Sequence, residues 1–159
     1  MLEMISPARR CTVRAMSNPA TPQAPGYGAS INLETARKVA AAAAAEAKKN
    51  GWTVAVAIVD TAGDLVYFER ADDTQVASSQ IAQDKARTAV RFKRPSKAFE
   101  EALQGGRLAI LGMPNAIPVE GGIPLLVDGK IVGAVGVSGV TSQQDGVCAQ
   151  AGVDALARR

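Results

Sequence analysis

Lys85 is the side chain of this sequence best suited to act as a base or as an anion anchor. It lies at i, i+4 spacing from Ile81 and Ala89 on a predicted helix, so it shares a face with residues that a helix buries. A lysine on such a face usually extends its ammonium group to the surface. If a pocket holds it instead, its pKa falls and it can accept a proton or bind an anion. The sequence leaves both alternatives open.

Glu120 offers the complementary carboxylate. It precedes Gly121 and Gly122, and paired glycines let a ligand approach backbone N–H groups. Glu120 is therefore either a loop carboxylate paired with a surface arginine or a carboxylate in a ligand pocket. A glutamate and a lysine that face one cavity can work as acid and base without a metal. We expect Lys85 and Glu120 to be this catalytic pair, with Gly121 and Gly122 binding the ligand.

Arg70 and Ser138 are further candidates for ligand binding. Arg70 ends a predicted strand, where its guanidinium could bind a substrate carboxylate through two hydrogen bonds or could pair with Asp72 or Asp73. Ser138 follows a predicted buried strand and could donate a hydrogen bond. No base is visible in the sequence to activate Ser138 as a nucleophile.

Two aspartates are expected to have structural roles. Asp60 begins the turn at 60–64, where its side chain can accept local hydrogen bonds. Asp145 lies in the first turn of the last predicted helix, where the helix dipole favours negative charge. Ser142 and Asp145 together resemble a capping box at the start of that helix.

The composition excludes several classes of function. The 159 residues include no histidine, which excludes Ser-His-Asp and Cys-His catalysis, His-ligated zinc and a proximal-His haem site, and we expect no metal site. A net charge of +3 and an aromatic content of 4% argue against a nucleic-acid partner. No apolar run approaches the roughly 18 residues of a membrane span. Cys11 and Cys148 lie far apart, which suits a reducing compartment and predicts a cytoplasmic protein, although a single disulfide stays open.

These side chains must be positioned by an α+β fold. The pattern predicts a flexible tail at 1–30 and one domain at 31–159. Asp128 and Gly129 between two apolar runs are a strong hairpin signal. Because hairpins require antiparallel pairing, we expect helices packed on an antiparallel sheet. The helices are predicted at 32–49, 75–92, 96–103 and from 142 onward, the first hairpin at strands 52–59 and 65–70, the second hairpin at 123–137, and a loop with at most one short strand at 107–119.

Four motifs in a fixed order resemble the GlcG/HbpS family, also called DUF336 or the haem-degrading domain family. The resemblance runs from Tyr27 to about Leu156, which is nearly the whole predicted domain. The motifs are Val59-Asp60-Thr61-Ala62-Gly63-Asp64-Leu65-Val66, Ala82-Gln83-Asp84-Lys85-Ala86-Arg87-Thr88-Ala89, Pro118-Val119-Glu120-Gly121-Gly122-Ile123-Pro124 and Gly133-Ala134-Val135-Gly136-Val137-Ser138-Gly139.

The resemblance implies a profilin-like or PAS-like sandwich that assembles into tetramers or octamers, and haem as a ligand of some members. Without histidine, the side chains that remain as iron ligands are Met113, Tyr27 and Tyr67. We therefore expect no tight haem binding of the histidine type, and a weak surface association is the alternative.

Three hypotheses about function follow. The first is a small-ligand-binding oligomer of the GlcG/HbpS type, with haem or a related tetrapyrrole as the implied ligand. The second is a cofactor-independent enzyme that transfers protons on a small carboxylated metabolite, with Lys85 and Glu120 as base and acid and Arg70 as anchor. The third is an assembly partner of a metabolic pathway protein.

Overall fold

The computed structural model describes residues 23–157, which contain a four-stranded antiparallel sheet. Its first hairpin is formed by β1 (Ala55–Val59) and β2 (Leu65–Arg70). Its second hairpin is formed by β3 (Gly122–Val127) and β4 (Lys130–Ser138). β1 pairs with β4, so the strand order is β2-β1-β4-β3 and the two hairpins form one sheet.

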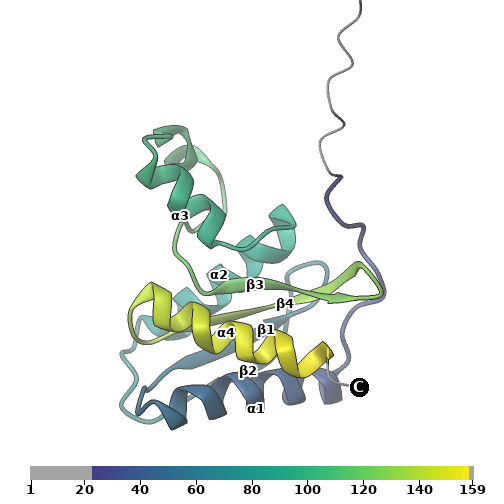
Figure 1. The fold of residues 1–159 in the computed structure, drawn as a ribbon, viewed down its shortest axis with the longest axis vertical. Helices are drawn as coiled ribbons and strands as arrows, with labels where there is room; N and C mark the ends of the chain where they lie inside the picture. Colours follow the sequence, from purple (N-terminus) through teal and green to yellow (C-terminus); the bar gives the residue numbers. More distant parts are fainter. Residues whose placement is uncertain (1–22, 158–159) are drawn as a thin grey trace, which may run out of the picture.

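Helices cover both faces of this sheet (Figure 1). α1 (Leu33–Lys49) and α4 (Ser142–Ala157) pack against each other and cover one face. α2 (Ser78–Phe92) covers the other face, where it contacts β1, β3 and β4. α3 (Lys97–Gln104) and the 3-10 helix η1 (Leu108–Gly112) lie beyond the sheet. The predicted α+β class is therefore confirmed.

Both faces of the central strands are buried. All five residues of β1 are buried, which explains why this strand reads as a continuous apolar run. Val56 and Ile58 pack in the core beneath α1 and α4, whereas Ala57 packs in a smaller cluster with Ala82 of α2. At Gly136 the backbone of α2 approaches so closely that an added Cβ would lie 2.0 Å from the carbonyl oxygen of Ala82.

The first helix begins and ends where its capping residues predict. The Asn32 side chain accepts a hydrogen bond of 2.8 Å from the N–H of Thr35. Asn50 follows the last turn, and Gly51 has a φ of +71°, which glycine adopts without strain. These local signals suffice to define α1.

Several predicted boundaries need correction. The strand expected from Trp52 begins at Ala55, and the helix expected from Gln75 begins at Ser78. Ser96 makes no side-chain cap for α3, because its hydroxyl instead accepts a 2.9 Å hydrogen bond from the N–H of Gly122. The region at 107–119 contains η1 and no strand.

The capping box of α4 lies one residue earlier than predicted. The N–H of Gln144 donates to the Thr141 hydroxyl at 3.4 Å, and the N–H of Thr141 donates to the Gln144 side chain at 3.2 Å. This reciprocal pair replaces the expected pair of Ser142 and Asp145. Asp145 is thereby available for a different contact.

The first described residues, before α1, run alongside β4 and are hydrogen-bonded to it. The N–H of Gly28 donates to the carbonyl of Ile131, and the N–H of Ile131 donates to the carbonyl of Gly26, at 2.8 and 2.9 Å. Residues 1–22, with most of the predicted tail and Cys11, lie outside the described range. Between residues 23 and 157, none of the helices has the length and apolar character needed to cross a membrane.

Candidate ligand-binding site

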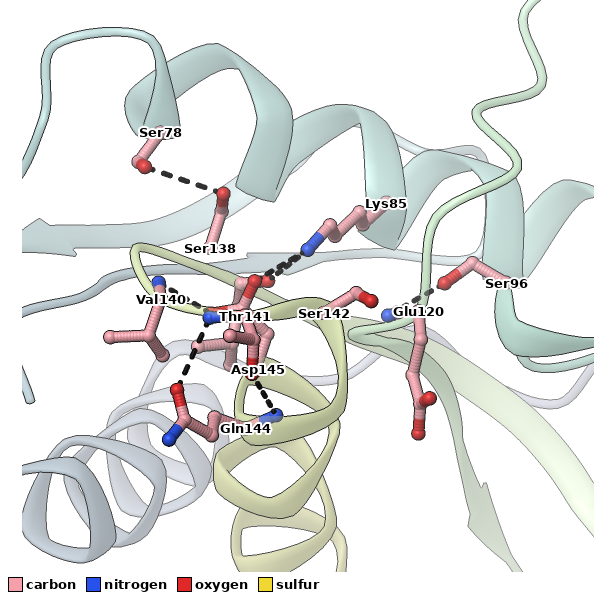
Figure 2. A network of polar contacts seen from close by, with 12 residues as sticks. Ser78, Lys85, Ser96, Glu120, Ser138, Val140, Thr141, Ser142, Gln144 and Asp145 are labelled. Atoms are coloured by element: carbon pink, nitrogen blue, oxygen red, sulfur yellow. Dashed lines mark hydrogen bonds and ion pairs between the residues drawn. The ribbon is translucent and has the colours of Figure 1, made fainter. Parts of the chain in front are cut away.

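A buried ion pair joins α2 to the start of α4. Lys85 Nζ lies 2.8 Å from Asp145 Oδ2, and the two side chains are only 1% and 2% exposed. The same ammonium donates to the carbonyl oxygen of Val137 at 3.1 Å. Figure 2 shows Lys85 extending from α2 toward Asp145. Because α2 and α4 cover opposite faces, the pair connects the two helical layers beside the sheet backbone.

Two glycines make room for Lys85. Gly121 has a φ of +127°, and a Cβ there would lie 2.6 Å from the carbonyl oxygen of Val137 and 2.9 Å from Lys85 Nζ. At Gly122 a Cβ would lie 2.1 Å from the carbonyl oxygen of Lys85. Any larger residue at either position would displace the lysine or the strand. The alternative that Lys85 extends its ammonium to the surface is wrong.

Asp145 has a different role from the one that its position predicted. It lies in the first turn of α4 as expected, but its carboxylate is buried against Lys85. Its other oxygen accepts a 3.2 Å hydrogen bond from the N–H of Val140. Burial raises the pKa of the Asp145 carboxyl, while the Lys85 ammonium and the backbone N–H groups oppose that rise.

Glu120 does not share a partner with Lys85. Its carboxylate lies 3.2 Å from Lys97 Nζ, and its backbone N–H donates to the Glu100 side chain. Figure 2 shows the Glu120 carboxylate pointing away from Lys85. On α4, a Cβ at Gly146 would lie 2.5 Å from Glu120 Oε1, so a larger residue there would displace the carboxylate.

Glu120 lines a pocket of about 340 Å³ between the start of β3 and α4. This volume lies within the roughly 300–1,000 Å³ of typical small-molecule sites. Gly121 and Gly122 line its wall, but the N–H of Gly122 already donates to the Ser96 hydroxyl at 2.9 Å. Lys97 contributes a half-exposed ammonium group. The lining residues are Pro95, Lys97, Glu120, Gly121, Gly122, Ile123, Gln143, Gly146, Val147 and Gln150.

The structure thus brings three of the predicted site residues together and places the others elsewhere. Glu120, Gly121 and Gly122 line one pocket, and Lys85 lies behind Gly121 without lining it. Sequence reasoning did not identify Asp145 as the partner of Lys85. The reciprocal bonds of Thr141 and Gln144 already cap α4. The carboxylate of Asp145, one residue later, is therefore not needed for the cap, and this was the sequence feature that could have indicated another partner.

Arg70 and Ser138 lie away from this pocket. Arg70 lines a separate pocket of about 510 Å³, and its Nη1 lies 3.5 Å from the Ser79 hydroxyl. Within residues 23–157 it forms no ion pair with Asp72 or Asp73. Ser138 is buried, and its hydroxyl donates to Ser78 at 3.3 Å. Asp60 stabilises its turn as predicted, since its Oδ1 accepts hydrogen bonds from three following N–H groups.

The three candidate iron ligands lie in different surroundings. The Tyr27 hydroxyl donates to the carbonyl of Val90 at 2.9 Å, and the Tyr67 hydroxyl donates to Glu69 at 3.0 Å. That bond to Glu69 raises the pKa of Tyr67, which disfavours the phenolate that would bind iron. Met113 lines a pocket of about 230 Å³ next to α3 and η1. In the described part of the chain, no three His, Cys, Asp or Glu side chains cluster as metal ligands would.

Comparisons with known proteins agree with this fold. Protein GlcG of Escherichia coli (strain K12) is 42% identical over 108 residues, which are 68% of this chain and 81% of GlcG. The crystal structure of Klebsiella pneumoniae protein ORFY, of the DUF336 family, matches with a TM-score of 0.76 at 29% identity and covers 89% of this chain and 98% of ORFY. The crystal structure of PduOC in complex with haem matches with a TM-score of 0.72 at 28% identity and covers 79% of this chain and 94% of PduOC.

A family model gives the same result over most of the chain. Residues 31–154 match the model described as haem degrading protein HbpS-like. This match contains all the helices and strands from α1 to β4 and most of α4. The four motifs identified in the sequence also fall within it or overlap it. The chain belongs to the HbpS-like family of haem degrading proteins.

Proposed function

We propose that this chain is a small-ligand-binding protein whose site is the pocket beside Glu120, Gly121 and Gly122. The observation that carries the proposal is the ion pair of Glu120 and Lys97 on the wall of a 340 Å³ pocket, where glycine at 146 leaves room for the Glu120 carboxylate. Such a mixture of apolar wall and a few polar groups is typical of small-molecule sites.

The charges of the wall indicate the chemistry of the ligand. Lys97 is half-exposed, so a ligand carboxylate can replace or share its contact with Glu120. Glu120 can then accept a hydrogen bond from a hydroxyl or amino group of the same ligand. Gln143 and Gln150 add amide groups at the α4 side of the pocket. The proposed ligand is therefore a small carboxylate that also carries a hydrogen-bond donor.

Haem is the second candidate ligand, because a relative of similar fold is known as a haem complex. Met113 lies in a pocket with Arg94 and Arg107, and a thioether and guanidinium groups suit haem iron and propionates. That pocket of about 230 Å³ is smaller than a typical ligand site. The pocket of about 510 Å³ is larger, but no imidazole, thiolate, thioether or phenolate lines it. We therefore expect haem, if it binds, to lie at a surface site or between two copies of the chain.

The acid–base hypothesis stays a prediction with a modified geometry. Glu120 lines the pocket, whereas the ammonium of Lys85 lies behind Gly121 and contacts Asp145. A ligand in the pocket meets Glu120 and Lys97 first, so a proton transfer there would use those two groups before Lys85. The assembly-partner hypothesis also stays a prediction.

Calorimetric titration with two- to four-carbon carboxylates, each with and without a hydroxyl group, tests the proposed ligand class. We expect saturable binding that is strongest for the hydroxylated acids and about tenfold weaker in Lys97→Gln, since a charge-assisted hydrogen bond contributes roughly 1.5–3 kcal/mol. Lys130→Gln, at the exposed first residue of β4, is the matched control. No binding, or equal binding by Lys97→Gln, would contradict the proposal.

A haemin titration followed by absorbance tests the second candidate. A saturable Soret band that is lost in Met113→Leu would support haem binding at the pocket of Met113. A band that survives this change would place haem elsewhere. The absence of a Soret band would contradict haem binding and would not affect the carboxylate proposal.

We also propose that the chain forms a homo-oligomer, as the family resemblance implies. Large apolar side chains are exposed on the described surface, among them Val76 at 80%, Leu108 at 68% and Leu111 at 66%. Light scattering that gives the monomer mass of 16.4 kDa would contradict this proposal. A cytoplasmic location and the expectation of no nucleic-acid or membrane partner stay predictions, which cell fractionation and binding assays can test.

A further inference from the structure

A polar pocket of about 350 Å³ lies between α2 and the segment that joins η1 to β3. It shares no lining residue with the pocket of Glu120. Its volume also lies within the range of roughly 300–1,000 Å³ for small-molecule sites. The residues that line it, and that define the arginine pocket, are Asp84, Arg87, Arg91, Asn115, Ala116 and Ile117.

One face of α2 supplies all the charged groups of the arginine pocket. Arg87 and Arg91 follow Asp84 at i+3 and i+7, so the three side chains share one face of the helix. The segment after η1 is fastened to the same helix, because the N–H of Ile117 donates to the Thr88 hydroxyl at 2.9 Å. Helix and segment therefore form two walls that a short hydrogen bond holds together.

The two guanidinium groups converge on one residue of the turn between β1 and β2. Arg87 Nε donates to the carbonyl oxygen of Gly63 at 3.2 Å. A Cβ added to Gly63 would lie 3.1 Å from Arg91 Nε and 3.4 Å from Arg91 Nη2. Both guanidinium groups thus lie against the same residue. Because like charges at i, i+4 repel each other, an anion beside them would stabilise this arrangement.

Two side chains of the pocket keep free hydrogen-bond donors. The guanidinium of Arg91 makes no ion pair and no hydrogen bond within residues 23–157, and the same holds for the side-chain amide of Asn115. Both side chains are exposed. Arg87, in contrast, already donates from each of its side-chain nitrogens to other described residues. Arg91 and Asn115 therefore supply the donors, and Arg87 adds positive charge.

Asp84 adds one carboxylate to this positive site. Its Oδ1 accepts a 2.9 Å hydrogen bond from Gln80 and lies 3.4 Å from Arg87 Nη1. Its Oδ2 has no partner in the described part of the chain. A carboxylate oxygen accepts a hydrogen bond from an O–H group, whereas it repels an oxyanion that carries no proton. The pocket therefore favours an anion that also has a hydroxyl group on its charged centre.

We propose that the arginine pocket binds a phosphate group that keeps a proton, either as the free ion or in a small ester. Arg91 and Asn115 donate to the phosphate oxygens, and the P–OH group donates to Asp84 Oδ2. A phosphate offers more acceptor oxygens than a carboxylate, which suits the several free donors here. Ala116 and Ile117 provide apolar surface for the organic part of an ester.

Calorimetric titration at about pH 6 with inorganic phosphate, phenyl phosphate and sulfate tests the proposal. Inorganic phosphate keeps a proton at this pH, and so does a large part of the ester, whose second pKa is about 6, whereas sulfate has none. We expect saturable binding of phosphate and at least about tenfold weaker binding of sulfate. Tighter binding of phenyl phosphate than of inorganic phosphate would identify an organic phosphate as the ligand, and the reverse order would identify the free ion.

Variants separate the arginine pocket from other charged surfaces. Arg91→Gln should raise the Kd for phosphate about tenfold by removing the free guanidinium. Asp84→Asn should bring the Kd values of sulfate and phosphate together, because an amide does not repel sulfate. Arg37→Gln removes an exposed arginine of α1 that lines neither this pocket nor that of Glu120, so the Kd should stay unchanged. Circular dichroism of each variant confirms that it is folded.

Three results would overturn the proposal. The first is no saturable heat with inorganic phosphate or phenyl phosphate. The second is sulfate bound as tightly as phosphate by the unmodified chain. The third is an unchanged phosphate Kd in Arg91→Gln together with a raised Kd in Lys97→Gln, which would assign the phosphate to the pocket of Glu120. Because the two pockets share no residue, failure here leaves the carboxylate titration of the Glu120 pocket unaffected.

Discussion

Replacing Lys85 by methionine should destabilise the protein strongly at neutral pH. Methionine fills nearly the same space with an unbranched side chain, so the main loss is the ammonium group that faces Asp145. Removing one partner of a buried pair leaves an uncompensated charge, which costs roughly 3–5 kcal/mol. For a domain of this size the midpoint of thermal unfolding should fall by roughly 6–20 °C. A total stability above about 7 kcal/mol, within the typical range of about 5–15 kcal/mol, leaves most of the variant folded.

The deficit of Lys85→Met should depend on pH in a defined direction. Burial already raises the pKa of Asp145 above its ordinary 3.8, and the variant loses both effects of Lys85 that oppose this rise. A carboxyl whose pKa is raised in the folded state destabilises that state only when it is ionised, so its protonated form carries no such cost. The deficit should therefore be absent below pH 3.8 and should grow as the pH rises through the folded pKa.

Guanidinium unfolding of both proteins from about pH 4.5 to pH 8 measures this difference. Adding Asp145→Asn to Lys85→Met removes the second charge and should restore most of the stability. Lys49→Met is the control, because Lys49 is 74% exposed and its 3.6 Å pair with Glu46 should contribute less than about 1 kcal/mol. The reasoning would be refuted by a Lys85→Met deficit under about 1 kcal/mol, or by a deficit that is equal at both ends of the pH range.

Three further substitutions or modifications test the geometry. Gly122→Ala places a Cβ 2.1 Å from a backbone oxygen of α2 and should cost about 1–3 kcal/mol in denaturant unfolding, whereas Gly112→Ala meets no atom within 4 Å and should be nearly neutral. Cys148 is buried with a pKa raised to about 11, so in a Cys11→Ser background it should react with a thiol reagent at pH 8 only after denaturation; rapid labelling of the folded chain would contradict its burial. Asp60→Ala removes the acceptor of three turn hydrogen bonds and should lower the free energy of unfolding by about 1–2 kcal/mol, and an unchanged midpoint would show that the turn is stable without it.

Local signals predicted much of the fold. The Asn32 cap defined the start of α1, and β2 was predicted at its observed bounds. Asp128 and Gly129 have φ values of 50° and 73°, which is the turn conformation that the pair favours between antiparallel strands. These features depend on neighbours within a few positions, so a single sequence carries them.

The site was harder to predict because its contacts join distant segments. Lys85 and Asp145 are separated by 60 positions, and no local pattern distinguishes a helix-start aspartate from the partner of a buried lysine. The bond from Gly122 to Ser96 likewise crosses 26 positions and takes Ser96 away from its expected cap. Glu120, Gly121 and Gly122 could be predicted together because they are consecutive. Sequence alone could not show that α4 would close their pocket.

The ion pair of Lys85 and Asp145 also sets how α4 can open. The ends of a helix ordinarily fray, and their amides exchange with solvent by local opening. Here the carboxylate in the first turn is held by α2, on the opposite face of the sheet. Detaching that turn requires breaking a contact with the other layer. Amide protons near Asp145 should therefore exchange only in openings that also release α2, while those toward Ala157 exchange far more often.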